Sequence, residues 1–449
     1  MITDRFLTNI YSITSSAIQE KVYDQARLCF VDYLSVTFSG ALKDSDKKLQ
    51  YIDDLGTGNP VSTILGMNRK TDMQTAALIN GINSHALELD DGNRQGGLHV
   101  GSTVFSALLA VAGKEDLSFM DFLYGAIVGY EATIRLACAI QPGNKLKGYH
   151  ATGTCGTLGA AIGIAAALGF NYEQMKSAVS AAVTCAAGVL EMQEDNSDYK
   201  PLNVGRAAMD AVAAAYLGKA GFVPPYDAIG GKRGFLKVMT DEPKTKFLTE
   251  FDAEQPMAIM TVYMKTYAAC RHTHPAIEAA LTLRKEYGLV PENIESIEVE
   301  AYKLAVAGHD HTDIRGVNSA KMSIPFSVAL ALCTGSADVA AFSEKNVKDD
   351  AIISLTKKVV VRENEELSSW VPQKRASILI LNLTDGRRLT HCVEYPKGEP
   401  ENPLTDSELE EKFMSLTKTA GFAQERASDI LQTIGQTNFK LRELLEKLN

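Results

Sequence analysis

Acidic, basic and imidazole side chains gather between His85 and Arg94, a stretch that reads His-Ala-Leu-Glu-Leu-Asp-Asp-Gly-Asn-Arg and is followed by His99. Side chains of these types, so close together, can orient a substrate and act as general acid or base. Asp91 and His99 are the candidate orienting groups. The alternative interpretation is a helix that ends at Gly92 with its acids in solvent, because charges are common near helix ends.

A second candidate stretch runs from Lys147 to Gly159, where His150 precedes a run of glycines and threonines that opens an apolar helix. The free N–H groups and the positive dipole end of such a helix start favour an anion. The glycines are spaced GxxGxxG rather than GxGxxG, and no strand precedes them. We therefore do not expect a dinucleotide-binding fold.

Two further stretches add cations. Lys200 comes just before an alanine-rich helix and can bind a carboxylate, although most lysines are simply solvated at the surface. The run from Lys265 to Pro275 contains Arg271, which can bind a carboxylate through two parallel hydrogen bonds. His272 and His274 in the same run belong to the residue type whose unperturbed pKa suits acid–base catalysis.

The spacing His-x-His occurs at His272 and His274, and again at His309 and His311. Neither pair has further cysteines, histidines or carboxylates at a zinc-like spacing, so we expect no metal site. The sequence also lacks the motifs of serine hydrolases with a GxSxG elbow, of P-loop nucleotide-binding proteins, of zinc proteases and of kinases.

The first half of the chain has the pattern of helices, rich in alanine and poor in β-branched runs. Several of these segments are apolar on most faces, which is typical of helices inside a multi-helix core. The expected helices are 18–38, 74–89, 103–113, 118–140, 157–168, 172–190 and 204–220.

The pattern changes after residue 258. We expect a helix over 275–287 and strands over 259–267, 294–301, 357–362, 377–383 and 388–394. Asp385-Gly386 between the last two strands is a strong hairpin signal. Thr405 and Glu408 form a capping box that begins a helix, and residues 427–448 are again helical in pattern. The predicted fold class is mainly α with an α+β insert: an all-helical domain of residues 1–265 and 401–449, and a smaller α/β lid domain of residues 266–400.

Composition narrows the possible partners. The net charge of −10 argues against nucleic acid as a partner, while leaving room for a local basic pocket. The seven cysteines are scattered without a CxxC pair, which favours a reducing compartment and no structural zinc. Cys155 and Cys270 lie near histidines, yet a free cysteine is more often a small buried hydrophobe than a nucleophile.

The sequence also bears on location. Residues 148–172 contain no Asp, Glu, Lys or Arg, but the strongly apolar part, 158–170, is too short to cross a bilayer. We interpret it as a buried core helix and expect no membrane contact. The N-terminus lacks a basic region followed by a long apolar run, so we expect no signal peptide and a cytoplasmic protein.

Taken together, these stretches resemble the MmgE/PrpD family, which includes 2-methylcitrate dehydratase, cis-aconitate decarboxylase and iminodisuccinate epimerase. Each motif is modest, but they occur in the expected order along nearly the whole chain. The matching stretches are 85–91 with His99, 129–131, 148–159, 200–208, 270–279, 320–332 and 395–413.

The resemblance implies a large helical domain with a smaller α/β lid, a homodimer, no cofactor and an active site between the domains. Carried across residue by residue, the catalytic residues are His150, His274, Lys200, His99 and Asp91. We expect substrate contacts from Arg271, Arg94, Thr152 and Lys265. The family often has other residues where Glu88, Gly92, Val100, Asn203 and Ala268 stand, which leaves the substrate open.

The function implied is a cofactor-independent lyase, a dehydratase or decarboxylase, that moves a proton next to a carboxylate of a small di- or tricarboxylate. In this hypothesis Lys200 and Arg271 stabilise the developing charge, and His150 and His274 act as base and acid. Two alternatives stay open: an epimerase or isomerase of an amino- or imino-dicarboxylate, and a binding homologue that has lost its activity.

Overall fold

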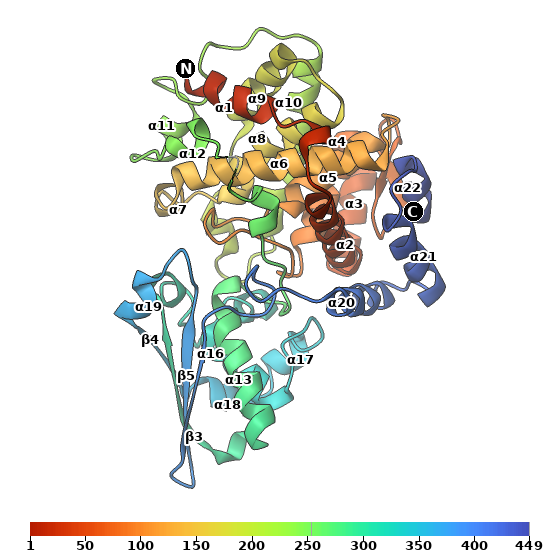
Figure 1. Ribbon diagram of the computed structural model, residues 1–449. Coiled ribbons are helices and arrows are strands. Elements are labelled where there is room, and N and C mark those ends of the chain that lie inside the picture. The colour runs from red at the N-terminus through yellow and green to blue at the C-terminus, as the bar shows by residue number, and fades with distance from the viewer. Residues whose placement is uncertain (253, 449) are drawn as a thin grey trace.

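The computed structural model describes residues 1–252 and 254–448, which form a larger helical lobe and a smaller α/β lobe (Figure 1). This confirms the predicted fold class. The main helices of the larger lobe are α1 (Ile2–Tyr11), α2 (Glu20–Leu42), α3 (Ser45–Leu55), α4 (Met73–His85), α5 (Gly101–Ala112), α6 (Phe119–Ile140), α8 (Ala151–Ala167), α9 (Tyr172–Cys185) and α10 (Lys200–Lys219). A short hairpin of β1 (Ser62–Ile64) and β2 (Arg69–Thr71) lies between α3 and α4.

Helices α6 and α8 form the centre of this lobe, and every residue of α8 is buried. Glycines let the two backbones come close: a Cβ atom at Gly163 would lie 2.8 Å from the carbonyl oxygen of Gly125. Because α8 is held in this way along its length, its first residue has a fixed position. His150, the N-cap residue of α8, is therefore fixed as well.

Helix α6 is long and apolar enough to cross a membrane by length and composition alone. However, 89% of its most apolar window is buried inside this chain. Its apolar character is thus accounted for by packing in the protein core, as expected for a helix without a polar face.

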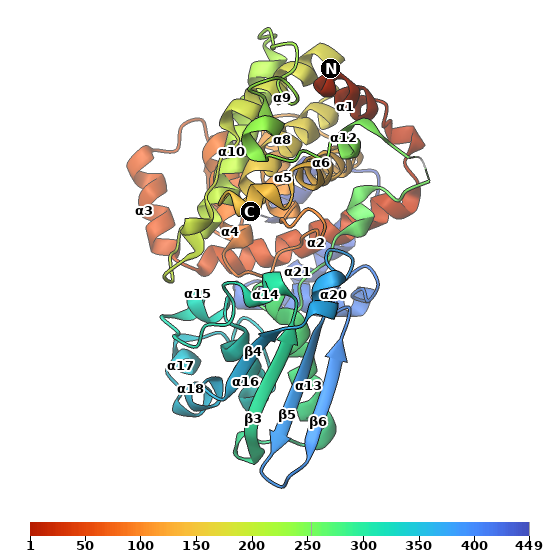
Figure 2. The ribbon, with the colours of Figure 1, turned by 90° about the vertical axis from the view of Figure 1, so that its left-hand side faces the viewer.

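The smaller lobe is built on a four-stranded sheet in the order β4–β3–β5–β6, seen face-on in Figure 2. Strand β3 (Ile294–Ala301) pairs in parallel with β4 (Val359–Glu363) and antiparallel with β5 (Ser377–Leu383), and β5 pairs antiparallel with β6 (Arg388–Val393). Helices α13 (His274–Tyr287) and α16 (Ile324–Thr334) pack beside the sheet, and α18 (Asp350–Thr356) packs on α16. The hairpin predicted at Asp385-Gly386 joins β5 to β6, with Gly386 at φ 86°.

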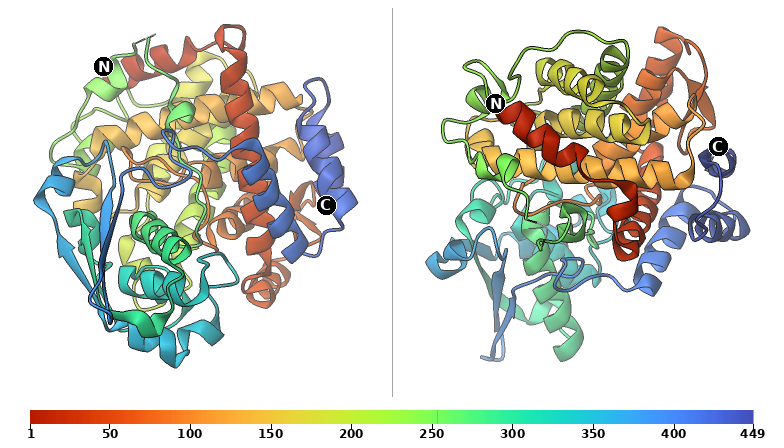
Figure 3. Two further views of the ribbon diagram at one scale, coloured as in Figure 1. Left: turned by 60° about the horizontal axis from the view of Figure 1, so that its bottom comes forward. Right: turned by 45° about the horizontal axis from the view of Figure 1, so that its top comes forward.

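The chain then returns to the helical lobe through α20 (Asp406–Thr419), α21 (Gln424–Ile434) and α22 (Leu441–Leu448). Figure 3 shows α20 running alongside α2. The capping box at Thr405 and Glu408 is present. The Lys412 ammonium on α20 donates to Asp32 on α2 at 2.5 Å and to the carbonyl oxygens of Leu89 and Lys265, which fixes α20 to two site segments.

Several predicted boundaries were wrong. Residues 259–267 form no named strand: a 3-10 turn covers Ala258–Thr261, and Tyr263 pairs with Gly92 in an isolated bridge. The glycines and threonines after His150 do not form a loop, because α8 already begins at Ala151. Helix α4 ends at His85 rather than at residue 89, so the acidic residues after His85 are not part of the helix.

Candidate functional site

The segment between α4 and α5 carries most of the site. It leaves α4 after His85 and returns at Gly101, and Glu88 within it adopts a left-handed conformation with φ 56°. Such a backbone costs about 1–3 kcal/mol for a residue other than glycine and is usually kept by its surroundings at functional sites. Here the surroundings are two ammonium groups, those of Lys200 and Lys265, which both lie against the Glu88 carboxylate.

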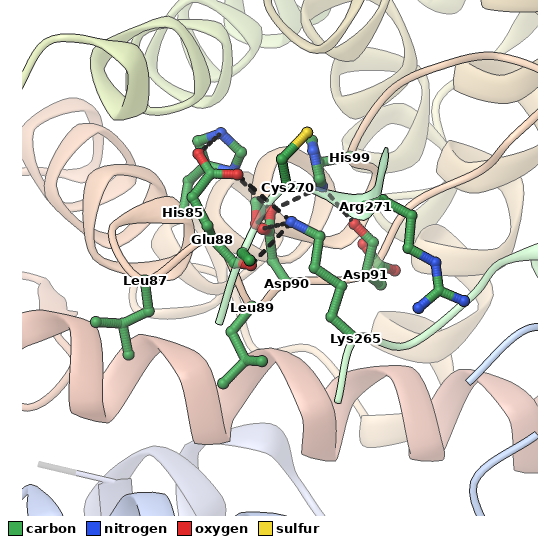
Figure 4. Close-up of polar contacts among 12 residues, drawn as sticks. His85, Leu87, Glu88, Leu89, Asp90, Asp91, His99, Lys265, Cys270 and Arg271 are labelled. Carbon is green, nitrogen blue, oxygen red and sulfur yellow. Dashed lines mark hydrogen bonds and ion pairs between the residues drawn. The ribbon is translucent and has the colours of Figure 1, made fainter. Parts of the chain in front are cut away.

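Two histidines of the segment direct Nδ1 towards one carboxylate oxygen (Figure 4). The Oδ2 atom of Asp90 lies 2.8 Å from Nδ1 of His85 and 3.4 Å from Nδ1 of His99, and it accepts a hydrogen bond from the Ser102 hydroxyl. The His85 and His99 rings pack edge to face with centroids 4.7 Å apart. Nδ1 of His99 donates to the carbonyl oxygen of Asp91 at 2.7 Å, which leaves its Nε2 lone pair free to accept a proton.

His150 completes a group of three imidazoles. Its ring lies 5.9 Å from that of His85, and Asn203 donates weakly to its Nδ1 at 3.4 Å. Burial lowers the pKa of His150 well below its usual value, and the positive charge of Lys200 adds to the effect. Burial likewise lowers the pKa of His99 to about 3, although Asp90 opposes this. Both rings are neutral near pH 7, the form required of a general base.

Lys200 connects these imidazoles to the acidic residues. It is the first residue of α10, and its ammonium forms an ion pair with Glu88 Oε1. Although burial opposes its charge, Glu88 keeps the pKa of Lys200 above its usual value, so the group is a fixed cation. The structure therefore brings three predicted catalytic residues together: His99, His150 and Lys200.

Three other predicted residues lie behind this group and support it. Asp91 is 3% exposed and accepts hydrogen bonds from the Tyr130 hydroxyl at 2.5 Å and the Gly101 amide at 2.9 Å. Its carboxylate therefore anchors the start of α5, which argues against the predicted catalytic role. The fully buried Thr152 accepts from the His99 amide at 3.0 Å. The fully buried Lys265 donates to Glu88, so both residues position the site without being open to substrate.

The internal contacts of Arg271 argue against its predicted role in binding substrate. Its five N–H groups are used inside the protein: two donate to Glu399, two to the carbonyl oxygens of Pro396 and Lys397, and one to Nδ1 of His274. The guanidinium is 3% exposed, so it has neither a free donor nor access to the cleft. The arginine does bind a carboxylate, but this is an internal one.

The same network holds His274 and Arg94. Nδ1 of His274 accepts from Arg271 at 2.9 Å, and Nε2 donates to the carbonyl oxygen of Ala269 at 3.1 Å. With both nitrogens occupied and no exposed surface, His274 is closed to substrate in this structure, which argues against its predicted catalytic role. Arg94 forms ion pairs with Glu399 and Glu401 and is likewise a structural residue.

Two adjoining cavities lie where the lobes meet. The outer cavity, about 290 Å³, is lined by residues 193–196 of the helical lobe and by His309, Arg315 and Met322 of the α/β lobe, among others. The inner cavity, about 20 Å³, is lined by His85, Glu88 and Lys200 from one lobe and by Asn318 and Met322 from the other. Gln193 and Met322 line both, so His85, Glu88 and Lys200 lie at the inner end of a cleft between the lobes.

Two groups of three potential metal ligands occur among the described residues: His85, Asp90 and His99, and Cys270, His272 and His309. Each group offers three ligand atoms within 4.8 Å of one another. Hydrogen bonds already account for the first group, where Asp90 bridges the two rings, and for the contact of Cys270 with His309 in the second. We assign neither as a metal site, and the expected absence of a metal stays a prediction.

Comparison with protein families supports the resemblance on which these residues were chosen. The MmgE/PrpD N-terminal domain matches residues 5–248, and the MmgE/PrpD C-terminal domain matches residues 267–436. The chain belongs to the MmgE/PrpD family.

Distant MmgE/PrpD relatives of known name cover almost the whole chain. The cis-aconitate decarboxylase of Aspergillus terreus is 26% identical over 440 residues, which cover 90% of this chain and 87% of the relative. The cis-aconitate decarboxylase-like protein oryM of Aspergillus oryzae is 26% identical over 444 residues, covering 93% and 91%. The human cis-aconitate decarboxylase is 23% identical over 436 residues, covering 92% and 87%. The family and these relatives support a lyase of the dehydratase or decarboxylase type.

Sequence reasoning missed several members of this MmgE/PrpD site. His85, Glu88 and Asp90 stood in the first stretch but were not chosen over Asp91, because adjacent acids look equivalent when the end of the helix is misplaced. The local sequence contains no signal that separates these residues from Asp91, because the chain leaves helical geometry after His85. The contact of Cys270 with His309 spans 39 residues and left no local signal.

Proposed function

We propose that this protein is a lyase that removes carbon dioxide or water from a small di- or tricarboxylate, by proton transfer next to a carboxylate and without a cofactor. One observation carries the proposal. The fixed cation of Lys200 and the ring of His85 line the inner end of a cleft between the lobes. The neutral rings of His99 and His150 lie behind them, with centroids 4.7 Å and 5.9 Å from that of His85. Neutral bases beside a buried ammonium are the groups that such a proton transfer needs.

The lysines support a carboxylate as the substrate group. Lys200 and Lys43 both line the inner cavity, and Lys43 is held by a hydrogen bond of 2.6 Å to Asn318. The inner cavity has room for about one water molecule. A carboxylate that displaces this water would meet the ammonium of Lys200, while the rest of the substrate would occupy the outer cavity. Entry therefore requires the lobes to move slightly apart.

The chemistry follows from the protonation states. In dehydration, the free Nε2 of His99 or the unprotonated ring nitrogen of His150 takes the proton next to a carboxylate. The electron pair left on carbon forms the double bond, and the hydroxyl takes a proton from a protein acid and leaves as water. In decarboxylation, the electron pair of the breaking carbon–carbon bond stays on the substrate, and a protein acid then protonates that carbon. In both reactions Lys200 stabilises the negative charge that develops on the remaining carboxylate.

The decarboxylase names of the relatives favour the second reaction. The differences at Glu88, Gly92, Val100 and Asn203 argue for testing a range of substrates. The experiment is a panel of saturated and unsaturated di- and tricarboxylates followed by proton NMR in heavy water. Formation of an unsaturated acid or release of carbon dioxide supports the lyase. Deuterium uptake without loss of either small molecule would assign an epimerase instead, and binding without any change would assign an inactive homologue.

We also propose that the protein acts as a cytoplasmic homodimer, as the resemblance to the family implies. Sedimentation of the purified chain tests the dimer directly, and a monomer at micromolar concentration would contradict it.

A further inference from the structure

A cysteine and a histidine of the α/β lobe form a polar pair that the mechanism above leaves unused. The Sγ atom of Cys270 lies 3.9 Å from Nε2 of His309. Nδ1 of His309 donates to the carbonyl oxygen of Met322 at 2.7 Å, which fixes the ring and turns Nε2 towards the thiol. Because Nδ1 keeps its hydrogen for this bond, Nε2 of the neutral ring can only accept. The thiol proton therefore has a defined acceptor.

A second histidine lies beside the pair. The rings of His272 and His309 stack with centroids 5.1 Å apart, and Nδ1 of His272 is 2.5 Å from the Tyr302 hydroxyl. Burial, together with the nearby charge of Lys145, lowers the pKa of His272 well below its usual value. His272 thus stays neutral, and His309 is the ring that can hold the thiol proton.

Charges around the pair favour the thiolate. Burial alone would raise the pKa of the Cys270 thiol, and the negative charge of Glu88 acts in the same direction. The charge and hydrogen bond of His309, together with the ammonium of Lys200, outweigh these effects and lower the pKa to about 6. Lys145 also interacts favourably with the thiolate. In return, Cys270 raises the pKa of His309 in spite of burial.

The pair lies beside the cleft in which substrate would bind. Cys270 is only partly buried, and the charges of Lys200 and Glu88 act on its thiol. His309 lines the outer cavity. Cys270 and His309 belong to the α/β lobe, whereas His85, His99 and His150 belong to the helical lobe. Proton-transfer groups therefore face the cleft from both lobes.

We propose that Cys270 and His309 form a thiolate–imidazolium pair that delivers a proton to the substrate from the α/β side of the cleft. This inference rests on the proposed function. When carbon dioxide leaves, the electron pair of the broken bond remains on the substrate carbon and takes the Sγ proton, which Sγ receives from Nε2 of His309. The pair then carries one proton fewer and regains it from water, so the net reaction consumes one proton from solvent.

The first test does not require activity. The rate at which iodoacetamide alkylates Cys270, followed by peptide mass spectrometry from pH 4.5 to 9, should be half-maximal near pH 6. In His309→Gln the midpoint should move up by at least one pH unit, towards the value of about 8.5 of an ordinary thiol. Cys333→Ser is the matched control, because Cys333 on α16 has a pKa raised by burial to about 11 and lies outside the site. A midpoint above pH 8, or one that His309→Gln leaves in place, would overturn the pair.

The second test separates this inference from the proposed function. Cys270→Ser and His309→Gln should each lower kcat for the active polycarboxylate by about 10²-fold or more, with KM changed only a few-fold, as expected for the loss of one acid–base group. Cys333→Ser should keep wild-type rates, and thermal melting checks that all variants fold. Activity of Cys270→Ser within threefold of wild type overturns the proton delivery.

If the wild-type protein turns over no polycarboxylate, the proposed function fails, whereas the alkylation midpoint still decides whether the pair exists. Stoichiometric zinc that blocks alkylation until a chelator removes it would also overturn the inference.

Discussion

The Nδ1 atom of His85 lies 2.8 Å from Oδ2 of Asp90, and both side chains are buried. A carboxylate in this position holds the hydrogen on Nδ1 and leaves Nε2 as the free nitrogen. Nε2 of His85 has no hydrogen-bond partner among the described residues, and its ring lines the inner cavity. The pairing therefore presents an unsatisfied buried nitrogen to the cleft.

Asp90→Asn should lower kcat by about 10²–10⁴-fold with little change in fold, because an amide can donate to Nδ1 and so reverse the tautomer of His85. Steady-state kinetics on the active polycarboxylate and circular dichroism measure the two effects. Ser102→Ala is the matched control, since it removes another hydrogen bond to the same oxygen without affecting the ring. Rates within threefold of wild type in Asp90→Asn would remove this pair from the mechanism.

Lys200→Ala should abolish most turnover, with a loss of about 10²-fold or more in kcat/KM, because it removes the cation that lines the inner cavity and acts on His150. The fold should survive, since Lys265 still balances Glu88. Lys47→Ala provides a comparison, because Lys47 also forms ion pairs but is largely exposed on α3. Initial rates measure the loss of activity in the two variants, and melting temperatures measure their stability. Near-normal rates in Lys200→Ala would contradict the role of Lys200.

His150→Ala should likewise abolish most turnover, by about 10²–10⁴-fold, because a neutral buried imidazole at the start of α8 acts as the base. The N-cap side chain makes no capping hydrogen bond, so the loss of helix stability should be small. Exchange of substrate hydrogens with heavy water, followed by NMR, reports on proton removal itself. If exchange persists at the wild-type rate in His150→Ala, His99 is the base instead.

The elements could be predicted from sequence far better than the site. The alanine-rich segments predicted helices α6, α8 and α10 correctly, because helix propensity and continuous burial act locally. Asp385-Gly386 predicted the β5–β6 hairpin through turn chemistry. The same local signals do not reveal which side chains pair across the fold. Arg271 and Glu399 are 128 residues apart, so nothing near Arg271 indicated that its donors were already taken.

The family resemblance found His99, His150 and Lys200, yet it did not separate residues that face the cleft from those that support them. Asp91 and His274 both lie in matching stretches. Burial and hydrogen bonds to backbone atoms or to other side chains, rather than residue type, set them apart from the residues that line the cleft. Such distinctions depend on side-chain direction, which a motif does not specify.

Arg271→Ala should destabilise the protein by about 3–5 kcal/mol, because among the described residues it leaves Arg94 as the one charged partner of the buried Glu399 carboxylate. Chemical denaturation at pH 7 measures this loss. Residual activity at low temperature should remain within an order of magnitude, since the guanidinium does not contact substrate. A variant of wild-type stability with a greatly raised KM would restore the substrate-binding role that the sequence first indicated.

Acid should destabilise the protein through its buried histidines. The pKa of His99 is lowered to about 3, whereas a histidine in the unfolded chain titrates near 6.5. Between these values only the unfolded state binds the proton, so the stability contributed by neutral His99 is fully present above about pH 6.5 and is lost as the pH falls towards 3. Each such histidine adds up to about 1.4 kcal/mol per pH unit to the slope of the unfolding free energy against pH.

Urea unfolding of wild type and His99→Gln between pH 7 and 4.5 measures the difference between their slopes, with His391→Gln on β6 as the control. The free energy of unfolding of His99→Gln should fall less steeply than that of wild type and of the control. Parallel slopes would show that His99 takes up its proton over the same pH range in the folded and unfolded protein.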